Sequence, residues 1–262
     1  MATYHSIAII GAGNLAWHLA PELENAGHTI TEVYSRDKKN AAALVKKLYN
    51  AEINTSLDFR QSEAGIIILA VADDAIEVLA PQIQLPATAI LVHTSGAQPL
   101  DKLGFAGTPR VGVFYPLQTF SKAKKVVWPE IPILIESEDI YTANILYKIA
   151  KSISKNVQKI SDEKRLAIHT AAVFSCNFPN FLMILAEEIL RAKKLDFDLL
   201  KPLVAETFTK VLAIGPRQSL TGPAKRGDLE TLDRHMAFLQ KNEELTKVYR
   251  LISQMILDKN NY

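Results

Sequence analysis

Residues 5–19 read HSIAIIGAGNLAWHL, and this stretch decides the fold. An apolar run over residues 5–10 leads into a turn rich in glycine, after which the apolar residues follow helical spacing. The pattern predicts a strand, a tight turn and the amino end of a helix. Unpaired N–H groups and the positive dipole end there suit a pyrophosphate, and glycine lets the backbone approach it. The residues that we expect to contact a dinucleotide are Gly11, Gly13, Asn14 and Leu15.

The chain around the turn strengthens this prediction. A glycine turn alone is a weak signal, because such turns between a strand and a helix also serve packing. Here a second apolar run, Ile30 to Tyr34, follows Gly27, which suits the position just past a helix end. A strand, a helix and a second strand thus fit within the roughly 30 residues that a dinucleotide-binding unit requires.

The residues after the second strand favour NADP(H) over NAD. An acidic residue at this place would bind the ribose hydroxyls of NAD and repel a 2′-phosphate. The chain instead has Ser35 and Arg36, a hydroxyl and a guanidinium that match a phosphate dianion. A structural alternative stays open, in which Ser35 or Asp37 caps the next helix and Arg36 is merely solvated.

Composition excludes several classes of protein. The 262 residues are 48% hydrophobic, enough for a substantial core. Thirty basic and 28 acidic residues give a net charge of +2, without the basic excess typical of nucleic-acid binding. The single cysteine, Cys176, excludes an internal disulfide and a cysteine zinc cluster, and we expect it to be a small buried residue. With no secretory signal at the start of the sequence, we expect a cytoplasmic protein without a metal.

The alternation of strand and helix patterns predicts two domains. Apolar runs rich in β-forming residues recur at residues 65–72, 89–93, 110–114 and 131–136. Helical patterns fill most of the gaps, which is typical of an α/β fold with a Rossmann-type, doubly wound and mostly parallel sheet. Strand signals stop near residue 155, and helical periodicity follows. We therefore expect a Rossmann domain over residues 1–155 and a smaller all-helical domain over residues 156–262.

One apolar stretch, Leu166 to Leu190, is long enough for a hydropathy scan to flag it as a membrane span. Polar residues and a proline interrupt it, and charged residues flank it on both sides. We expect a central buried helix and no membrane. The helix should kink near Ser175, because Pro179 lacks the N–H that would bond there.

Ligands of open α/β sheets bind beyond the carboxyl ends of the strands. After the third apolar run we expect the backbone of Val71 and Ala72 to lie against the cofactor, and Asp73 or Asp74 to cap the next helix. Thr94 and Ser95 follow the fourth run and are candidates to contact the nicotinamide, although a plain turn explains them almost as well. The last candidates, Tyr115 and Gln118, follow the fifth run on a loop that Pro116 stiffens; they could contact a substrate or simply pack the loop down.

Four segments of the chain are distinctive: residues 11–18 (GAGNLAWH), 93–97 (HTSGA), 114–120 (FYPLQTF) and 221–228 (TGPAKRGD). They resemble a bacterial family of Rossmann-like NADP oxidoreductases with a helical domain of unknown function, and the likeness covers nearly the whole chain. More distantly the chain resembles pyrroline-5-carboxylate reductase, ketopantoate reductase and the 3-hydroxyacid dehydrogenases. The resemblance implies NADPH-dependent hydride transfer to a small carbonyl or imine in the cleft between the domains, and a homodimer formed through the helical domain. It does not imply a particular substrate.

Reduction of a C=O or C=N bond needs a proton donor beside the charge that develops. At 100° per residue, His169, Cys176 and Asn180 lie close together on the long helix, with Asn177 about 80° away. We predict His169 as the acid, Asn177 as the residue that orients the substrate and Asn180 as a substrate contact. The hydroxyacid dehydrogenases place a Lys and an Asn one turn apart on this helix, a pair that this chain lacks. A core histidine, with asparagines that satisfy the backbone freed by Pro179, remains the alternative.

The segment around Arg226 has two interpretations. Its guanidinium, held between glycine turns, could bind a substrate carboxylate or form a salt bridge with a partner subunit. Asp228 is expected to cap the following helix.

Two further classes of function stay open for the chain. The missing Lys–Asn pair suits a non-enzymatic NADP(H) sensor, and Pro21 within the first helix gives slight support to an interaction protein with a vestigial turn.

Overall fold

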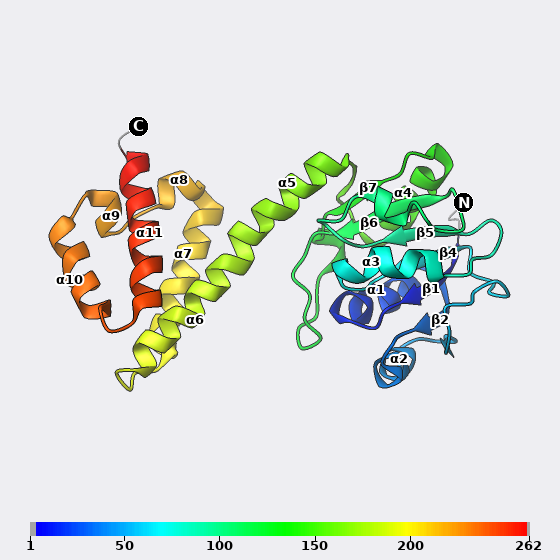
Figure 1. The fold of residues 1–262 in the computed structure, drawn as a ribbon, viewed down its shortest axis with the longest axis horizontal. Coiled ribbons are helices and arrows are strands. Elements are labelled where there is room, and N and C mark those ends of the chain that lie inside the picture. Colours follow the sequence, from blue (N-terminus) through cyan, green and yellow to red (C-terminus); the bar gives the residue numbers. More distant parts are fainter. Residues whose placement is uncertain (1–3, 261–262) are drawn as a thin grey trace. The chain divides into compact units, whose positions relative to one another are not determined.

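The computed structural model describes residues 4–260 and divides into two compact units, Met1–Cys176 and Asn177–Tyr262. The first unit is a sheet with helices on both faces, and the described part of the second is built from helices and turns (Figure 1). The predicted fold class, a Rossmann-type α/β domain followed by a helical one, is confirmed.

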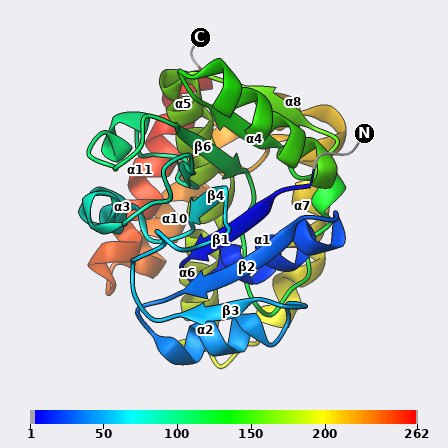
Figure 2. The same cartoon turned by 90° about the vertical axis from the view of Figure 1, so that its right-hand side faces the viewer.

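The sheet has eight strands in the order β3-β2-β1-β4-β5-β6-β7-β8. Figure 2 shows its lower edge, with β3, β2 and β1 in succession. Neighbouring strands run parallel except β6 and β7, which are antiparallel. The strands are β1 Ser6–Ile10, β2 Thr29–Tyr34, β3 Glu52–Asn54, β4 Ile66–Leu69, β5 Ile90–His93, β6 Val111–Pro116, β7 Ile133–Glu136 and β8 Val157–Lys159.

Helices cover both faces because the central strands are apolar on both sides. In β1, Ile7 and Ile9 pack into a core with α1, α2 and α4, whereas Ala8 and Ile10 pack into a second core with α3. The helices of this unit are α1 Asn14–Asn25, α2 Lys38–Val45, α3 Asp73–Leu79, α4 Ile140–Ile153 and α5 Asp162–Ala172. Short 3-10 helices lie at Ala80–Gln82, Leu100–Leu103 and Trp128–Glu130.

The edge strands β3 and β8 were not predicted. Each has three residues, and their side chains are exposed or half-buried, so neither produces an apolar run. β8 lies beyond residue 155, where strands were expected to end. The second compact unit accordingly begins at Asn177 rather than at residue 156, because β8 and α5 both belong to the first unit.

The helical unit contains α6 Phe178–Arg191, α7 Lys201–Ile214, α8 Pro216–Ser219, α9 Pro223–Arg226, α10 Leu229–Leu239 and α11 Glu243–Asn260, with a 3-10 helix at Phe197–Leu200. Asp228 caps α10 as expected, its carboxylate accepting a 3.1 Å hydrogen bond from the Thr231 amide. Buried apolar side chains are few within residues 177–260, and each keeps some exposed surface, so the unit's own core is thin. They are Ala224, Leu232, Leu239 and Leu245.

The apolar part of the helix through residues 162–191 is not buried, which corrects the sequence prediction. By length and composition it is the one helix within residues 4–260 that could cross a membrane, yet no residue of its most apolar window is buried. Phe174 is 65% exposed, and Cys176, expected inside, is also exposed. The prediction failed because an apolar helix face indicates only that something covers it. The sequence does not say whether that is the rest of the same chain or another molecule.

A π-helical segment, Val173–Asn177, joins α5 to α6. Pro179 is the second residue of α6 and has no N–H to donate to the Ser175 carbonyl, so the regular hydrogen-bond pattern cannot continue here. The disturbance thus falls where it was expected. A π turn holds an extra residue, so the polar stripe from His169 to Asn180, built on uniform 100° steps, is not preserved across it.

Candidate functional site

The glycine turn leaves the amino end of α1 open. Gly11 has φ +108°, and a Cβ there would collide with the Ala70 carbonyl at the end of β4. Gly13, the residue before α1, has ordinary backbone angles, and a Cβ there would meet nothing within 4 Å. No side chain within the described residues caps α1. This end of the helix is therefore free to bind an anion through the backbone of Asn14 and Leu15.

The phosphate-binding candidates follow β2. Ser35 is half-buried, and Arg36 is exposed and forms no ion pair within residues 4–260. Asp37 caps α2, its carboxylate accepting a 2.9 Å hydrogen bond from the Lys39 amide. The capping interpretation therefore holds for Asp37, and Arg36 remains available for a phosphate.

The segment after β4 differs from the prediction in one respect. Neither Asp73 nor Asp74 caps α3: the preceding residue is Ala72, and both aspartates lie in the first helical turn. Carboxylates there stabilise the helix through its dipole rather than by a capping hydrogen bond. The backbone of Val71 and Ala72 stays at the carboxyl end of β4, where the cofactor was expected.

The two hydroxyl groups of the loop after β5 hydrogen bond to the protein backbone. Thr94 Oγ1 donates to the Leu69 carbonyl at 3.1 Å, and Ser95 Oγ accepts from the amides of Ala97 and Gln98 at 3.0 and 2.9 Å. Both side chains are buried. A cofactor contact from this loop would therefore come from its backbone.

Tyr115 and His169, predicted separately, lie against each other. The Tyr115 hydroxyl is 2.9 Å from His169 Nδ1, and the two rings meet edge to face. Tyr115 comes from β6 and His169 from α5. Burial raises the pKa of the Tyr115 phenol, and the negative charge of Asp73 raises it further. Tyr115 is therefore a neutral hydrogen-bonding group at ordinary pH.

Two further residues lie beside this pair, a placement that the sequence analysis did not predict. Gly96 faces it: a Cβ there would lie 2.5 Å from His169 Nδ1 and 2.5 Å from Tyr115 Cζ. Arg165, one turn before His169, is fully buried and hydrogen bonded to the loop after β5. Its position in the charged run 162–165 resembled a solvated helix start, and only its spacing of four from His169 could have drawn attention to it.

Of the remaining candidates, Gln118 belongs to the first unit and does not join this pair. Gln118 is exposed, and its side-chain oxygen accepts from the Thr119 amide at 2.8 Å, so it folds onto its own loop. Asn177, Asn180 and Arg226 belong to the helical unit and are exposed. Arg226 Nη2 lies 4.0 Å from Asp228 Oδ2, a loose pairing within its own chain.

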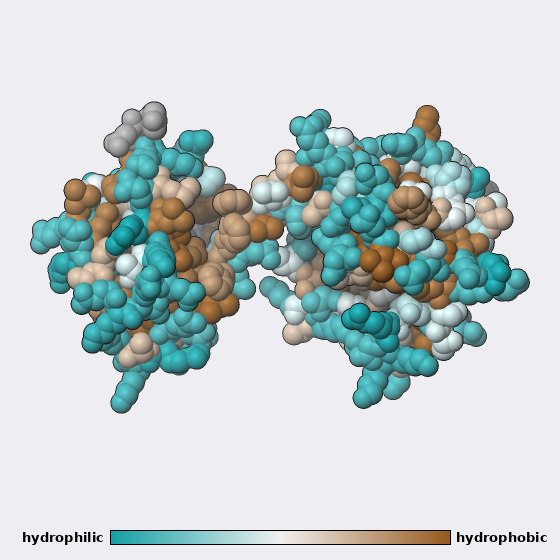
Figure 3. All heavy atoms as spheres, viewed as in Figure 1, coloured by the Kyte–Doolittle hydropathy of each residue, from teal (hydrophilic) through white to brown (hydrophobic). Residues whose placement is uncertain are grey.

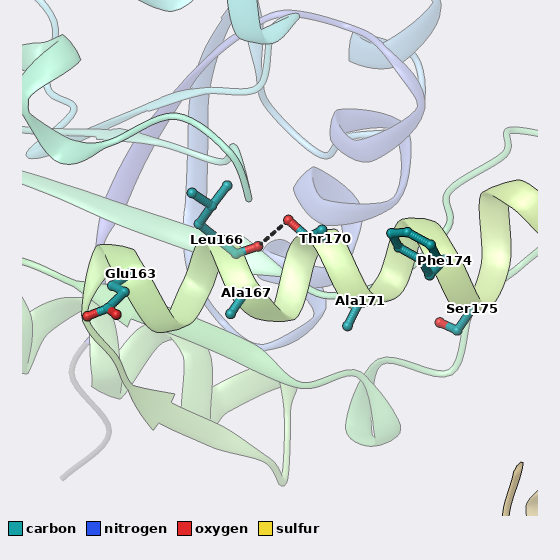
Figure 4. Close-up of a pocket in the computed structure, with 7 residues that line it drawn as sticks. All are labelled: Glu163, Leu166, Ala167, Thr170, Ala171, Phe174 and Ser175. Atoms are coloured by element: carbon teal, nitrogen blue, oxygen red, sulfur yellow. Dashed lines mark hydrogen bonds between the residues drawn. The ribbon is translucent and has the colours of Figure 1, made fainter. Parts of the chain in front are cut away.

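The described residues line hollows on both units. One, of about 790 Å³, runs along α5 and the start of the π-helical segment and is lined by Glu163, Leu166, Ala167, Thr170, Ala171, Phe174 and Ser175 (Figure 4). Another, of about 320 Å³, lies in the helical unit between α6, α10 and α11 and is mostly apolar. Within residues 4–260, no group of three His, Cys, Asp or Glu side chains is placed to hold a metal.

Comparisons with known proteins agree with the fold. Residues 6–96 match the family model "NADP oxidoreductase coenzyme F420-dependent", and residues 131–256 match a domain of unknown function, DUF2520. A Bacteroides fragilis protein, provisionally assigned as an NADP oxidoreductase, is 37% identical, with a TM-score of 0.89 over 97% of this chain and 98% of its own. No curated protein matches.

More distant structures share the fold. A Thermotoga maritima protein is 24% identical, with a TM-score of 0.79 over 98% of this chain and all of its own. An imine reductase from Myxococcus stipitatus in complex with NADP+ is 15% identical, with a TM-score of 0.67 over 97% of this chain and 93% of its own. The family match and the fold together place the chain among oxidoreductases of the Rossmann type. The chain belongs to the family of NADP oxidoreductases that join this domain to a domain of unknown function.

Proposed function

We propose that this protein is a cytoplasmic reductase that uses NADPH to reduce a carbonyl or imine group of a small substrate. The observation that carries the proposal is the open amino end of α1, with Gly13 facing empty space and the unpaired Arg36 following β2. The family membership and the paired Tyr115 and His169 support it.

The residues present fit the cofactor. The turn at Gly11 and Gly13 and the amides of Asn14 and Leu15 would hold its pyrophosphate, and Ser35 and Arg36 its 2′-phosphate. Backbone at Val71, Ala72, Thr94 and Ser95 would lie along the cofactor. When bound, NADPH supplies a hydride.

His169 is proposed as the proton donor. Because its Nδ1 is hydrogen bonded to the Tyr115 hydroxyl, Nε2 is the ring nitrogen left to face a substrate. Tyr115 fixes the plane of the imidazole and contacts the substrate. The roles proposed for Asn177 in orienting the substrate, and for Gln118, Asn180 and Arg226 in binding it, stay predictions that single substitutions test.

The cofactor choice is tested with Arg36→Ala. We expect this variant to bind NADPH far more weakly than the wild type, while its affinity for NADH changes little, because only NADPH carries the 2′-phosphate. Calorimetric titration measures both affinities. An equal loss for the two cofactors would contradict the phosphate role of Arg36.

The reaction is tested by NADPH oxidation over a panel of keto acids and cyclic imines, with His169→Gln as the comparison. We expect at least one substrate to be turned over, and the substitution to lower kcat by about 100-fold or more, the usual size of an acid–base contribution. An unaltered kcat in His169→Gln would contradict its role as the acid.

A regulatory NADP(H)-binding protein is the second candidate, because no Lys–Asn pair one turn apart follows the sheet. Tight binding of both NADP+ and NADPH, without hydride transfer to any compound of the panel, would favour it. At a ligand concentration of about 100 times its dissociation constant, binding raises the unfolding free energy by roughly 2.7 kcal/mol. No rise with either cofactor would instead favour an interaction protein.

We also propose that the protein forms a homodimer through its helical unit. Large apolar side chains are exposed along α6 and α7, and Figure 3 shows hydrophobic residues gathered on the visible face of this unit. They include Phe178, Phe181, Leu203 and Leu212. Contiguous apolar surface of this kind marks an interface.

The dimer is tested by light scattering of the purified protein. We expect twice the chain mass of 29.1 kDa, and loss of the dimer in the double variant Phe181→Asp, Leu212→Asp, with Leu251→Asp as the exposed apolar control on α11. A monomeric wild type would contradict the proposal, and partition of the wild type into lipid vesicles would point to a membrane instead.

A further inference from the structure

Arg165 is the most deeply buried charged side chain in the described structure, with no exposed surface. A guanidinium has five N–H donors, and burying it without partners is very costly. Here every donor has an acceptor. Nε donates to Glu136 Oε2 at 3.2 Å. Nη2 donates one hydrogen to Glu136 Oε2 at 3.0 Å and the other to Asp162 Oδ1 at 2.6 Å.

The two remaining donors reach the loop after β5. Arg165 Nη1 donates to the Ser95 carbonyl at 3.0 Å and to the Gln98 carbonyl at 2.7 Å. One side chain of α5 thus ties together three parts of the first unit: the end of β7 at Glu136, the start of α5 at Asp162, and the loop after β5. A fork of fixed geometry fixes the spacing between these parts, which a flexible lysine could not do.

His169 follows Arg165 by four residues, so both side chains lie on the same side of α5. Between this side of the helix and the loop there is space for glycine only. A Cβ on Gly96 would lie 2.5 Å from His169 Nδ1 and 2.5 Å from Tyr115 Cζ. A small movement of α5 toward or away from the loop would therefore either press on the hydrogen bond between Tyr115 and His169 or open it.

We propose that Arg165 is the positioning residue of the site: through the Ser95 and Gln98 carbonyls it sets the distance at which His169 meets Tyr115 across Gly96. This inference rests on the proposed function, in which His169 is the acid. It adds a residue that touches neither cofactor nor substrate and acts only through His169.

The test records the side-chain nitrogen resonances of histidine in the protein labelled with 15N. In Tyr115→Phe the hydrogen bond to His169 Nδ1 is absent, so this variant gives the resonance position of the broken pair. We expect Arg165→Lys to move the His169 Nδ1 resonance most of the way to that position, because an ammonium group cannot make the five bonds of the fork.

Two controls separate positioning from stability. Arg60→Lys makes the same chemical change in an exposed ion pair with Asp58, and Ile149→Ala truncates a buried residue of α4. Both should leave the His169 Nδ1 resonance in place, although Ile149→Ala lowers the melting temperature. If Arg165→Lys also leaves the resonance at its wild-type position, the positioning role is wrong.

A second variant serves if Arg165→Lys does not fold. Glu136→Gln keeps Arg165 but removes the charge from the oxygen that accepts two of its bonds, and we expect a shift of the His169 resonance in the same direction but smaller. No shift would overturn the proposal. Titration of the wild type with NADPH is a separate measurement: lack of binding there would remove the proposed function, whereas the resonances decide the role of Arg165 in either case.

Discussion

Gly11 and Gly13 stand two residues apart in one turn, but they are glycines for different reasons. Gly11 adopts a positive φ and lies against the Ala70 carbonyl. The fold itself therefore leaves no room for a side chain at this position. Gly13 has a backbone conformation open to any residue and empty space beside it. The space beside Gly13 leaves room for a ligand to come close to the backbone, as the proposed pyrophosphate would.

Alanine at each position separates the two roles. Gly11→Ala should lower the unfolding free energy by about 2 kcal/mol or more, from the left-handed conformation and the collision. Gly13→Ala should change it by less than about 1 kcal/mol, the size of a helix-capping effect, but weaken NADPH binding strongly. Urea unfolding and calorimetry measure the two quantities. Unimpaired NADPH binding in Gly13→Ala would contradict the placement of the pyrophosphate.

His93 gives the stability of the protein a pH dependence. Burial, with a contribution from the charge of Arg165, lowers its pKa to about 3, from 6.5 for a free histidine. Between these two values the unfolded chain binds a proton at His93 that the folded chain does not. Stability therefore falls as the pH drops below 6.5, by up to about 1.4 kcal/mol per pH unit. Burial lowers the pKa of His5 and His28 as well, in the same direction.

The contribution of His93 is measured by urea unfolding between pH 7 and 4.5. His93→Asn keeps an acceptor near the position of Nδ1 for the Ser95 amide, a bond of 3.2 Å in the structure, and has no titrating group. We expect a shallower loss of stability in this variant than in the wild type. His235→Gln, in an exposed histidine, should keep the wild-type slope. Equal slopes in all three proteins would contradict the argument.

Among the elements, those buried on two sides were predictable and those at the edges were not. The central strands β1, β4 and β5 are apolar except for Ser6 and His93, and the sequence pattern is typical of strands buried on both faces. β3 and β8 owe their existence to a neighbour that offers hydrogen bonds, which no local pattern records. The long helix shows the opposite failure, since its apolar pattern was recognised but was wrongly taken to mean burial.

Hydrogen exchange should separate the same two groups of strands. Amides of β1, β4 and β5 should exchange slowest, because opening them requires global unfolding, whereas those of the edge strands β3 and β8 should exchange through local opening. Mass spectrometry of peptides after labelling measures the rates. If β8 were as protected as β1, the assignment of β8 as a weakly held edge strand would be wrong.

At the scale of the whole molecule, the sequence offered Tyr115 and His169 as candidates but did not predict that they lie against each other. Tyr115 and His169 were candidates on separate grounds, and only the fold brings the hydroxyl to the imidazole. The places of Arg165 and Gly96 beside this pair were not predicted, because each contacts residues distant in the sequence. The helical unit has a thin core and leaves large apolar side chains exposed to solvent. Covering them by a second copy of the chain is the physical basis of the proposed dimer.

The account depends on a cofactor held at the amino end of α1. Calorimetric titration of the wild-type protein with NADPH and, in parallel, with NADH tests this most directly. The account predicts saturable binding of one NADPH per chain, with NADH bound far more weakly. Absence of binding by both cofactors, or equal affinity for the two, would contradict it.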